Sequence, residues 1–596
     1  MRVLLLTPPL VQPNAPYPAT PVLTAYLRSR GIAAAQADLS LALLLRLFSR
    51  RGVRMLAREL ERRPPRRGAA AARFFRAHAA AYERTVEPVV AFLQGRAPEL
   101  AARIAGRRWL PEGPRFAVLA ELPAEAAPED EQTAARHLAS LYLDDLADAV
   151  REGLDERFGL ARYAERLAAA TPDFAPLAAA LEGPPTAVDR EIEALARAAV
   201  RRARPDLVAV TAPFPGCVYG AFRVARAVKA ERPGCLTVLG GGYPSTELRE
   251  LADARVFRYF DRVVLDDGCA PLRRLARGGR PARTFECRGG RVRYRGDAAA
   301  RPPRHGRMPA PVYDGLPLPR YLALRETTNP MLALWSDGRW NKLMLAHGCY
   351  WRRCAFCDTS LDYIRRFDPA PAATALAWMD RVYAETGYAG FHFVDEAAPP
   401  ALLARLSELL IAGRRPYRWW GNIRFEPAFT PALARRMAQA GCVAVSGALE
   451  TASPRTLALM RKGITLAGAE RAMRALAQAG ILVHAYLMYG FPTQTRAETV
   501  AALETVRRLF AAGALHSAYW HRFALTAHSP MGRAPERFGL RLLPAPAGGF
   551  ARNELPYAEP GGDALERLGA ALRRATYNYM HGIGLHEDAR VWFRDV

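Results

Sequence analysis

Lysine is nearly missing from this strongly basic chain of 596 residues. Only Lys229, Lys342 and Lys462 are lysines among the 84 Lys and Arg residues, although the net charge at pH 7 is +26. A positive surplus of this size can indicate nucleic-acid binding. Here scattered arginines carry the charge beside abundant alanine, with no dense basic tail and no interleaved aromatic residues. We therefore attribute the charge to codon usage and predict no nucleic-acid partner.

Long apolar runs are also lacking. No stretch approaches the ~18 residues that a membrane-spanning helix needs, and the apolar run Leu41–Leu47 is short enough to predict an ordinary helix. Met1–Leu6 is followed at once by Thr7-Pro8-Pro9, which is typical of a first buried strand rather than of a signal peptide. The sequence therefore predicts a cytoplasmic protein without a membrane span.

Cysteine is sparse, and five of the eight cysteines are isolated, which excludes a disulfide framework. The other three, Cys349, Cys354 and Cys357, lie within nine positions at the end of an apolar run. Thiolates at such close spacing select an iron–sulfur cluster, zinc or copper(I). A structural zinc site would need a fourth ligand, for which His347 is a candidate. A cluster held by three cysteines would keep one iron open.

The first half of the chain is predicted to be a doubly wound α/β domain, split by a helical insertion. Its predicted strands are Val3–Leu6, a short strand ending near Asp38, Leu207–Thr211, Leu236–Leu239 and Arg262–Leu265. Residues 1–40 and 203–300 are assigned to this domain, and the stretch from Arg277 to Met308 to a hairpin or connector. Residues 41–202 are rich in alanine, leucine, arginine and glutamate with helical periodicity, so they form the insertion.

The second half alternates strands and helices, which predicts a partial (βα)6 barrel of the TIM type over residues 319–530. The predicted strands are Leu343–Ala346, Phe391–Asp395, Arg418–Arg424, Val443–Glu450, Leu482–Met488 and Ser517–Leu525. The predicted helices are Ala372–Thr386, Pro400–Ala412, Pro431–Ala440, Ala467–Ala479 and Arg496–Ala512. Residues 531–596 are a C-terminal extension with a helix near Asp563–Met580. Active residues of such barrels gather at the strand C-termini, where the cysteine loop also lies.

The cysteine loop, Phe356 before its last cysteine and the following βα repeats resemble a radical S-adenosylmethionine enzyme. That family usually spaces its cysteines by three residues and then two, whereas the spacing here is four and two, a variant of its cobalamin-associated members. The resemblance implies a [4Fe–4S] cluster on Cys349, Cys354 and Cys357, whose open iron binds S-adenosylmethionine. Reduction by one electron would release a 5′-deoxyadenosyl radical, so an electron donor such as flavodoxin or ferredoxin is implied.

The same resemblance assigns contacts with S-adenosylmethionine to successive strand ends of the barrel. Phe356 and the backbone at Gly490 would lie near the adenine, and Glu450 near the ribose. The residues implied to bind the methionine part are Asp395 or Glu396 for its amino group and Arg424 for its carboxylate. Read without the family, Asp395 and Glu396 could equally cap a helix, and Arg424 could pair with Glu426.

The front domain resembles the cobalamin-binding domain that precedes the barrel in one radical S-adenosylmethionine subgroup. The resemblance implies cobalamin contacts at Thr7, Pro8, Thr211, Gly240, Gly241 and Gly242, with the glycines leaving room for the nucleotide tail. The cobalt-ligating pattern Asp-x-His-x-x-Gly is absent, so cobalt would have no protein histidine below it.

Together these features predict a cobalamin-dependent radical enzyme that methylates an unactivated carbon of a small-molecule or peptide substrate. Two alternatives remain open at this point. One is a radical rearrangement or oxidation without methyl transfer, and the other is an iron–sulfur electron-transfer protein without turnover. Candidate side chains near the substrate lie on the last two strands. They are His484, Tyr486, Tyr519 and His521.

Overall fold

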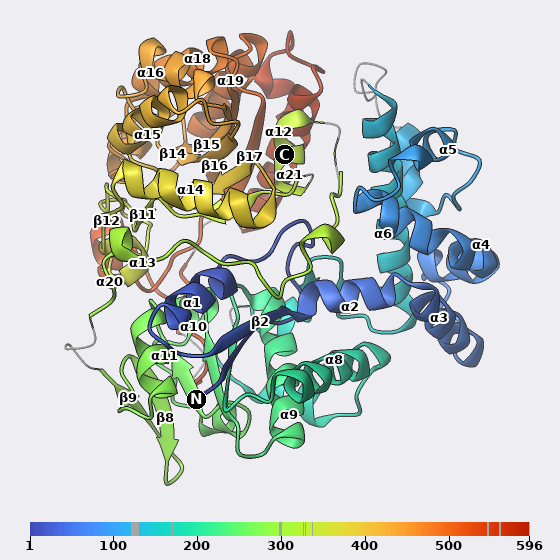
Figure 1. The fold of residues 1–596 in the computed structure, drawn as a ribbon. Helices are drawn as coiled ribbons and strands as arrows, with labels where there is room; N and C mark the ends of the chain where they lie inside the picture. Colours follow the sequence, from blue (N-terminus) through green and yellow to red (C-terminus); the bar gives the residue numbers. More distant parts are fainter. Residues whose placement is uncertain are drawn as a thin grey trace.

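The computed structural model contains a seven-stranded and a six-stranded sheet, one in each half of the chain (Figure 1). It describes residues 1–120, 130–169, 171–296, 301–325, 327, 329–336, 338–544, 548–558 and 562–594. No helix within these residues is long and apolar enough to cross a lipid bilayer. Each of the two sheets has its own apolar core, as the sequence predicts.

The first sheet has the strand order β2-β1-β5-β6-β7-β8-β9. Its strands are β1 (Val3–Thr7), β2 (Ala34–Asp38), β5 (Leu207–Thr211), β6 (Leu236–Gly240), β7 (Arg262–Val264), β8 (Thr284–Arg288) and β9 (Arg291–Arg295). The first five are parallel, and β8 and β9 add an antiparallel hairpin at one edge. The predicted doubly wound domain is confirmed. The stretch from Arg277 to Met308, predicted as a hairpin or connector, contains the hairpin of β8 and β9. Its residues 297–300 lie outside the described ranges.

Helices cover both faces of this sheet because the parallel strands are apolar on both sides. One face packs against α1 (Ala19–Arg28) and α11 (Cys269–Ala276). The other face packs against α2 (Leu39–Leu47), α8 (Ala187–Ala203) and α9 (Val218–Glu231). Side chains from successive positions of β1 divide between the two faces, with Leu4 and Leu6 on one and Val3 and Leu5 on the other.

The helical insertion shares the core of the sheet instead of forming a separate unit. Its elements are α3 (Arg50–Arg62), α4 (Ala70–Leu93), α5 (Ala101–Ala105), α6 (Glu131–Gly153), α7 (Ala175–Glu182) and the hairpin of β3 (Phe158–Gly159) and β4 (Arg162–Tyr163). Buried side chains of α3 to α7 belong to the same apolar cluster as Leu4 and Val208. Helix α8, which the predicted boundary at 202 places in the insertion, lies on the sheet and leads into β5; the boundary stays a prediction.

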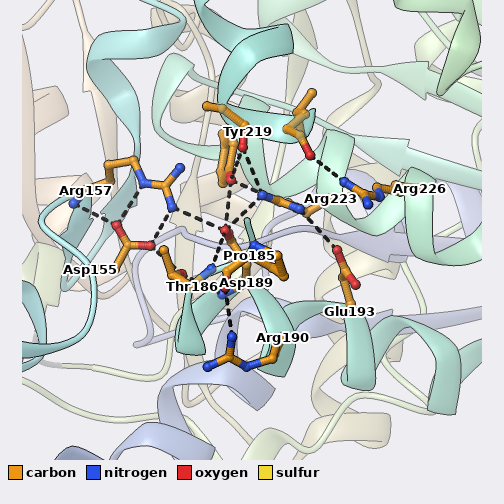
Figure 2. Close-up of polar contacts among 12 residues, drawn as sticks. Asp155, Arg157, Pro185, Thr186, Asp189, Arg190, Glu193, Tyr219, Arg223 and Arg226 are labelled. Carbon is orange, nitrogen blue, oxygen red and sulfur yellow. Dashed lines mark hydrogen bonds and ion pairs between the residues drawn. The ribbon is translucent and has the colours of Figure 1, made fainter. Parts of the chain in front are cut away.

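A buried polar network joins the insertion to this domain (Figure 2). Its centre is Asp189 on α8, whose carboxylate accepts hydrogen bonds from Tyr163 at 2.7 Å and from Tyr219 and Arg223 at 3.0 Å. Arg157, which follows α6, donates to Asp189 at 3.2 Å and to Asp155 at 2.8 Å. The side chains of Asp189 and Arg223 are completely buried. Opposite charges therefore compensate one another in the interior, where an isolated charge would be costly.

The second sheet is an open, fully parallel barrel wall with the strand order β10-β13-β14-β15-β16-β17. Its strands are β10 (Asn341–Leu343), β13 (Gly390–Phe393), β14 (Arg418–Ile423), β15 (Cys442–Glu450), β16 (Leu482–Tyr489) and β17 (Ser517–Arg522). The outer helices are α14 (Ala372–Thr386), α15 (Pro400–Ala412), α16 (Pro431–Gln439), α18 (Leu466–Gln478) and α19 (Arg496–Ala511). The predicted six-stranded partial barrel is confirmed.

The two faces of this wall differ in character because side chains alternate along each strand. Phe393, Trp419 and Val445 face the outer helices and form the main apolar core with them. The opposite, concave face carries a row in which Ser446, His484 and Ser517 are paired in register. The short helix α12 (Pro330–Ser336) packs against this concave face near Trp420.

The region assigned as a C-terminal extension completes the barrel domain and also contacts the front domain. Helix α21 (Gly562–Met580) packs beside β17 and α19, where a sixth outer helix belongs. Before it, Phe550 enters the core of the front domain, and Ala252 donates a backbone hydrogen bond of 2.7 Å to Gly549. The extension thus holds the two domains together.

Candidate active site

The cysteine loop follows β10 and the short strand β11 (Ala346–His347). Strand β11 pairs in antiparallel fashion with β12 (Asp368–Pro369), which lies after the loop. Cys354 and Cys357 are in side-chain contact, and the hydrogen bond from Cys357, together with the charges of Lys462 and Arg424, lowers the pKa of Cys354 to about 6. Cys349 does not join them: in the described chain, which contains all three cysteines, no three His, Cys, Asp or Glu side chains are grouped to hold a metal ion. The cluster on three cysteines stays a prediction.

Segments far apart in the sequence fix the cysteine loop by hydrogen bonds and apolar contacts. The backbone N–H of Ala355 donates to Met460 O at 2.8 Å, and the N–H of Met531 donates to Ala355 O at 3.0 Å. The hydroxyl of Thr526 donates to the carboxylate of Asp358 at 2.5 Å. Apolar side chains from β16 and the C-terminal region pack beneath Ala355. The position of the cysteines therefore depends on the whole barrel and on the chain that follows it.

His347, the candidate fourth ligand of a zinc site, has its Nε2 3.0 Å from an oxygen of Asp362, and a histidine held in this way can still bind a metal through its other ring nitrogen. Asp362 also pairs with Arg366 at 3.3 Å, and Arg366 pairs with Asp267 of the front domain at 3.0 Å. These contacts link the cysteine loop to the C-terminal edge of the first sheet.

Asp395 and Glu396 have different environments although they are adjacent. Asp395 is buried, and its carboxylate accepts backbone hydrogen bonds of 2.7 to 3.1 Å from Leu345 and Ala346. It thereby fixes the turn from β10 into the cysteine loop, so the prediction that Asp395 contacts S-adenosylmethionine is revised. Glu396 instead lines a cavity, and although its side chain is accessible from that space, the surrounding walls desolvate the carboxylate and raise the pKa of Glu396 to about 7. The predicted helix-cap role is wrong, since α15 is preceded by Pro399.

Arg424 and Glu450 are brought together by Lys462, which the sequence reasoning missed. The ammonium of Lys462 lies 2.7 Å from the carboxylate of Glu450, and both side chains are less than 10% exposed. Arg424 donates to the backbone oxygen of Lys462 and lies 3.6 Å from Glu426. The alternative pairing of Arg424 with Glu426 is therefore present. The available signal was the rarity of lysine in a chain that uses arginine almost everywhere else.

Two further predicted residues lie at the same end of the barrel. The ring of Phe356 is half-buried with Lys462 5.8 Å from its centre. Gly490 follows β16 in the left-handed region at φ +72°, which glycine adopts without strain. The structure places Phe356, Glu450 and Arg424 around Lys462, whereas Gly490 turns the chain beside Leu565 of α21.

A cavity of about 670 Å³ lies between the two domains, bounded by the C-terminal strand edge of the first sheet and the start of the barrel. From the front domain it is lined by Thr211 and Gly240–Gly242, and from the barrel by His347 and Glu396. The hydroxyl oxygen of Thr211 is buried without a hydrogen-bond partner. Thr7 and Pro8 are buried at the end of β1 but do not line the cavity. Their predicted cobalamin contacts are therefore not supported.

The three glycines at the cavity serve different purposes. A Cβ atom at Gly240 would meet only Val264 O, at 3.8 Å, so this position leaves open space. A Cβ atom at Gly241 would lie 2.6 Å from Ala212 O, and one at Gly242 2.6 Å from Pro213 O. Gly241 and Gly242 are thus required by the close approach of the loop after β5, although all three glycines line the cavity and their contact with a ligand stays a prediction.

The concave face of the barrel holds the predicted substrate-side candidates. His484 is completely buried, its Nδ1 lies 2.7 Å from Ser517 Oγ, and burial lowers its pKa to about 3, so it is neutral. Tyr486 packs against His484 and His521, while Tyr519 is half exposed. The structure therefore brings these four side chains to one aromatic wall.

Sequence comparison agrees with the resemblance that the cysteine loop and the βα repeats carry. Residues 343–506 match the sequence model of the radical SAM superfamily. The matched part runs from the end of β10 into α19, which is where the radical SAM barrel was predicted, and it supports the predicted enzyme class.

The chain is also similar to one curated protein and to solved structures. The uncharacterized methyltransferase PH0819 of Pyrococcus horikoshii is 25% identical over 329 residues, which are 52% of this chain and just under two thirds, 66%, of that protein. The radical S-adenosylmethionine methyltransferase TsrM of Kitasatospora setae, solved with cobalamin and a [4Fe–4S] cluster bound, matches 97% of this chain and 89% of its own at 16% identity, with a TM-score of 0.53. The cobalamin-dependent radical enzyme OxsB matches 64% of this chain and 59% of its own at 14% identity, with a TM-score of 0.49. The likeness to TsrM confirms the predicted fold, a doubly wound α/β domain followed by a partial barrel.

Proposed function

We propose that this protein is a cobalamin-dependent radical S-adenosylmethionine methyltransferase acting on an unactivated carbon. The observation that carries the proposal is the cavity of about 670 Å³ that residues of both domains line. It is lined on one side by Gly240 and Thr211, where cobalamin is expected, and on the other by Glu396 and His347 beside the cysteine loop. The name of the relative PH0819 also supports methyl transfer.

The residues present fit both cofactors chemically. Cys349, Cys354 and Cys357 would hold the cluster, because three thiolates on one loop suit iron and leave one site open. The positive charges of Lys462 and Arg424 favour the thiolate form of Cys354. At the other side of the cavity, Thr211 offers a buried oxygen without a protein partner. When bound, the cluster would supply the electron that cleaves S-adenosylmethionine, and cobalamin would carry the methyl group.

The protein's own side chains would orient the ligands and control protons. Lys462 fixes the carboxylate of Glu450, which can then accept hydrogen bonds from ribose hydroxyls. Glu396 has a pKa near neutrality inside the cavity, so it can take up or release a proton there at physiological pH. Apolar lining residues such as Leu5, Leu343 and Trp378 exclude water from the same space.

Anaerobic reconstitution with iron, sulfide and hydroxocobalamin tests the proposal. Absorption spectra should show both cofactors, and incubation with S-adenosylmethionine, a reductant and candidate substrates should yield S-adenosylhomocysteine together with 5′-deoxyadenosine. Formation of 5′-deoxyadenosine alone would favour rearrangement or oxidation. An intact, reducible cluster that does not cleave S-adenosylmethionine would instead indicate an electron-transfer protein.

A further inference from the structure

An open groove of about 1110 Å³ lies on the outer side of the cysteine loop, away from the cavity between the domains. We call it the arginine groove. Its walls are the stretch between Cys349 and Cys354, the short helix α17 (Pro454–Leu459) and the segment that leads into α18. The lining residues used below are Trp351, Arg352, Arg353, Arg461 and Gly463.

The groove carries positive charge that its surroundings do not neutralise. Arg352, Arg353 and Arg461 are exposed, and no aspartate or glutamate is among the lining residues. Within the described chain, none of these three arginines has a carboxylate within ion-pairing distance, whereas neighbouring Arg455 pairs with Glu498 at 2.7 Å. Unpaired charges of one sign, gathered at one concave surface, attract a partner of the opposite sign.

The indole of Trp351 lines the groove and also contacts one of the predicted S-adenosylmethionine side chains, Arg424. Its Nε1 donates to Arg461 O at 2.9 Å. Its ring lies 4.8 Å from the guanidinium of Arg424 and 5.3 Å from that of Arg353. A Cβ atom at Gly463 would lie 1.9 Å from this ring, so only glycine admits the packing. One aromatic side chain, two positions after Cys349, thus connects the groove with the interior of the site.

We infer that the arginine groove is the docking site of an acidic protein that carries a single low-potential electron, of the flavodoxin or ferredoxin type. The inference rests on the proposed function, because it presupposes a cluster on Cys349, Cys354 and Cys357. In the transfer the carrier is oxidised by one electron and the cluster is reduced by one. Electron tunnelling weakens steeply with distance, so a protein donor must bind close to the cysteines, and one wall of this groove is formed by Trp351, Arg352 and Arg353, which lie between Cys349 and Cys354 in the chain.

Charge reversal tests the inference in the reconstituted full-length protein. In Arg353→Glu/Arg461→Glu, reduction by flavodoxin hydroquinone, followed by stopped-flow absorbance, should slow at least tenfold at low ionic strength. The salt dependence of the rate should also flatten, because fewer charges steer the encounter. Reduction by photoreduced deazaflavin, which needs no docking, should stay at the wild-type rate. The matched control, Arg381→Glu/Arg435→Glu, alters the net charge equally on the outer helices α14 and α16 and should behave as wild type in both assays.

Direct binding is measured as well, by calorimetry with oxidised flavodoxin, so that the result does not depend on cluster formation. The groove variant should bind at least tenfold more weakly than wild type and the control variant. Wild-type affinity and wild-type reduction rate in the groove variant would overturn the inference, and so would equal losses in both variants. Loss of binding to a single-stranded RNA oligonucleotide, with flavodoxin binding unchanged, would assign the groove to nucleic acid instead. A chain that takes up no iron but shows the expected flavodoxin binding would refute the proposed chemistry and not the docking site.

Discussion

Gly240 and Gly241 are adjacent at the cavity, yet their substitution should have opposite consequences. Gly240→Val places a side chain in open space, since only Val264 O lies within 4 Å of its Cβ, at 3.8 Å. Gly241→Ala forces alanine to φ +112° and brings its Cβ to 2.6 Å from Ala212 O. The first change should impair cobalamin binding in a folded protein, and the second should impair folding itself.

The expected magnitudes differ accordingly. Valine suits a strand better than glycine, so Gly240→Val should alter the free energy of unfolding by less than ~1 kcal/mol. Overlap between the new methyl groups and a ligand that fills the cavity costs about 1–3 kcal/mol, which corresponds to a roughly 5- to 150-fold higher Kd. For Gly241→Ala, backbone strain of about 1–3 kcal/mol adds to an overpacking cost of similar size.

The assay titrates anaerobic protein with hydroxocobalamin and measures the cobalamin absorbance retained after gel filtration. Thermal unfolding followed by circular dichroism shows whether each variant is folded. Wild-type cobalamin affinity in Gly240→Val would refute the assignment of the cavity. Wild-type stability in Gly241→Ala would refute the explanation of that glycine by the approach of Ala212.

Three other perturbations test the polar groups. Asp189→Ala removes the centre of the buried network and should destabilise it by about 3–5 kcal/mol, accelerating amide exchange in α8, whereas Glu83→Ala at an exposed ion pair should not. The raised pKa of Glu396 means that the folded protein keeps a proton that the unfolded chain releases between about pH 4.3 and 7. The Tm of wild type should therefore fall with rising pH in that window, and Glu396→Gln should flatten this fall; parallel curves would contradict the assignment. Lys462→Met leaves Glu450 buried without its cation and should cost about 3–5 kcal/mol in thermal or denaturant unfolding, while adding Glu450→Gln should restore part of it.

The sequence by itself determined the order and type of the elements. Helical and strand periodicities are local properties, so α14 and α15 have the predicted bounds and five of the six barrel strands begin within one residue of their predicted starts; the first, predicted at Leu343–Ala346, is instead Asn341–Leu343. The spacing of Cys349, Cys354 and Cys357 likewise lies within one loop and needs no tertiary information. Together they were sufficient to predict the fold class and the radical SAM domain.

Tertiary structure decided which side chains meet, because such contacts depend on the paths of segments distant in sequence. Asp395 was assigned to a ligand, but its carboxylate binds the backbone of Leu345 and Ala346, 50 and 49 positions away. Lys462 had no recognisable motif, and its role follows only from its contact with Glu450. Gly241 is glycine because Ala212 approaches it, which is a property of two neighbouring strand ends and cannot be read from either one alone.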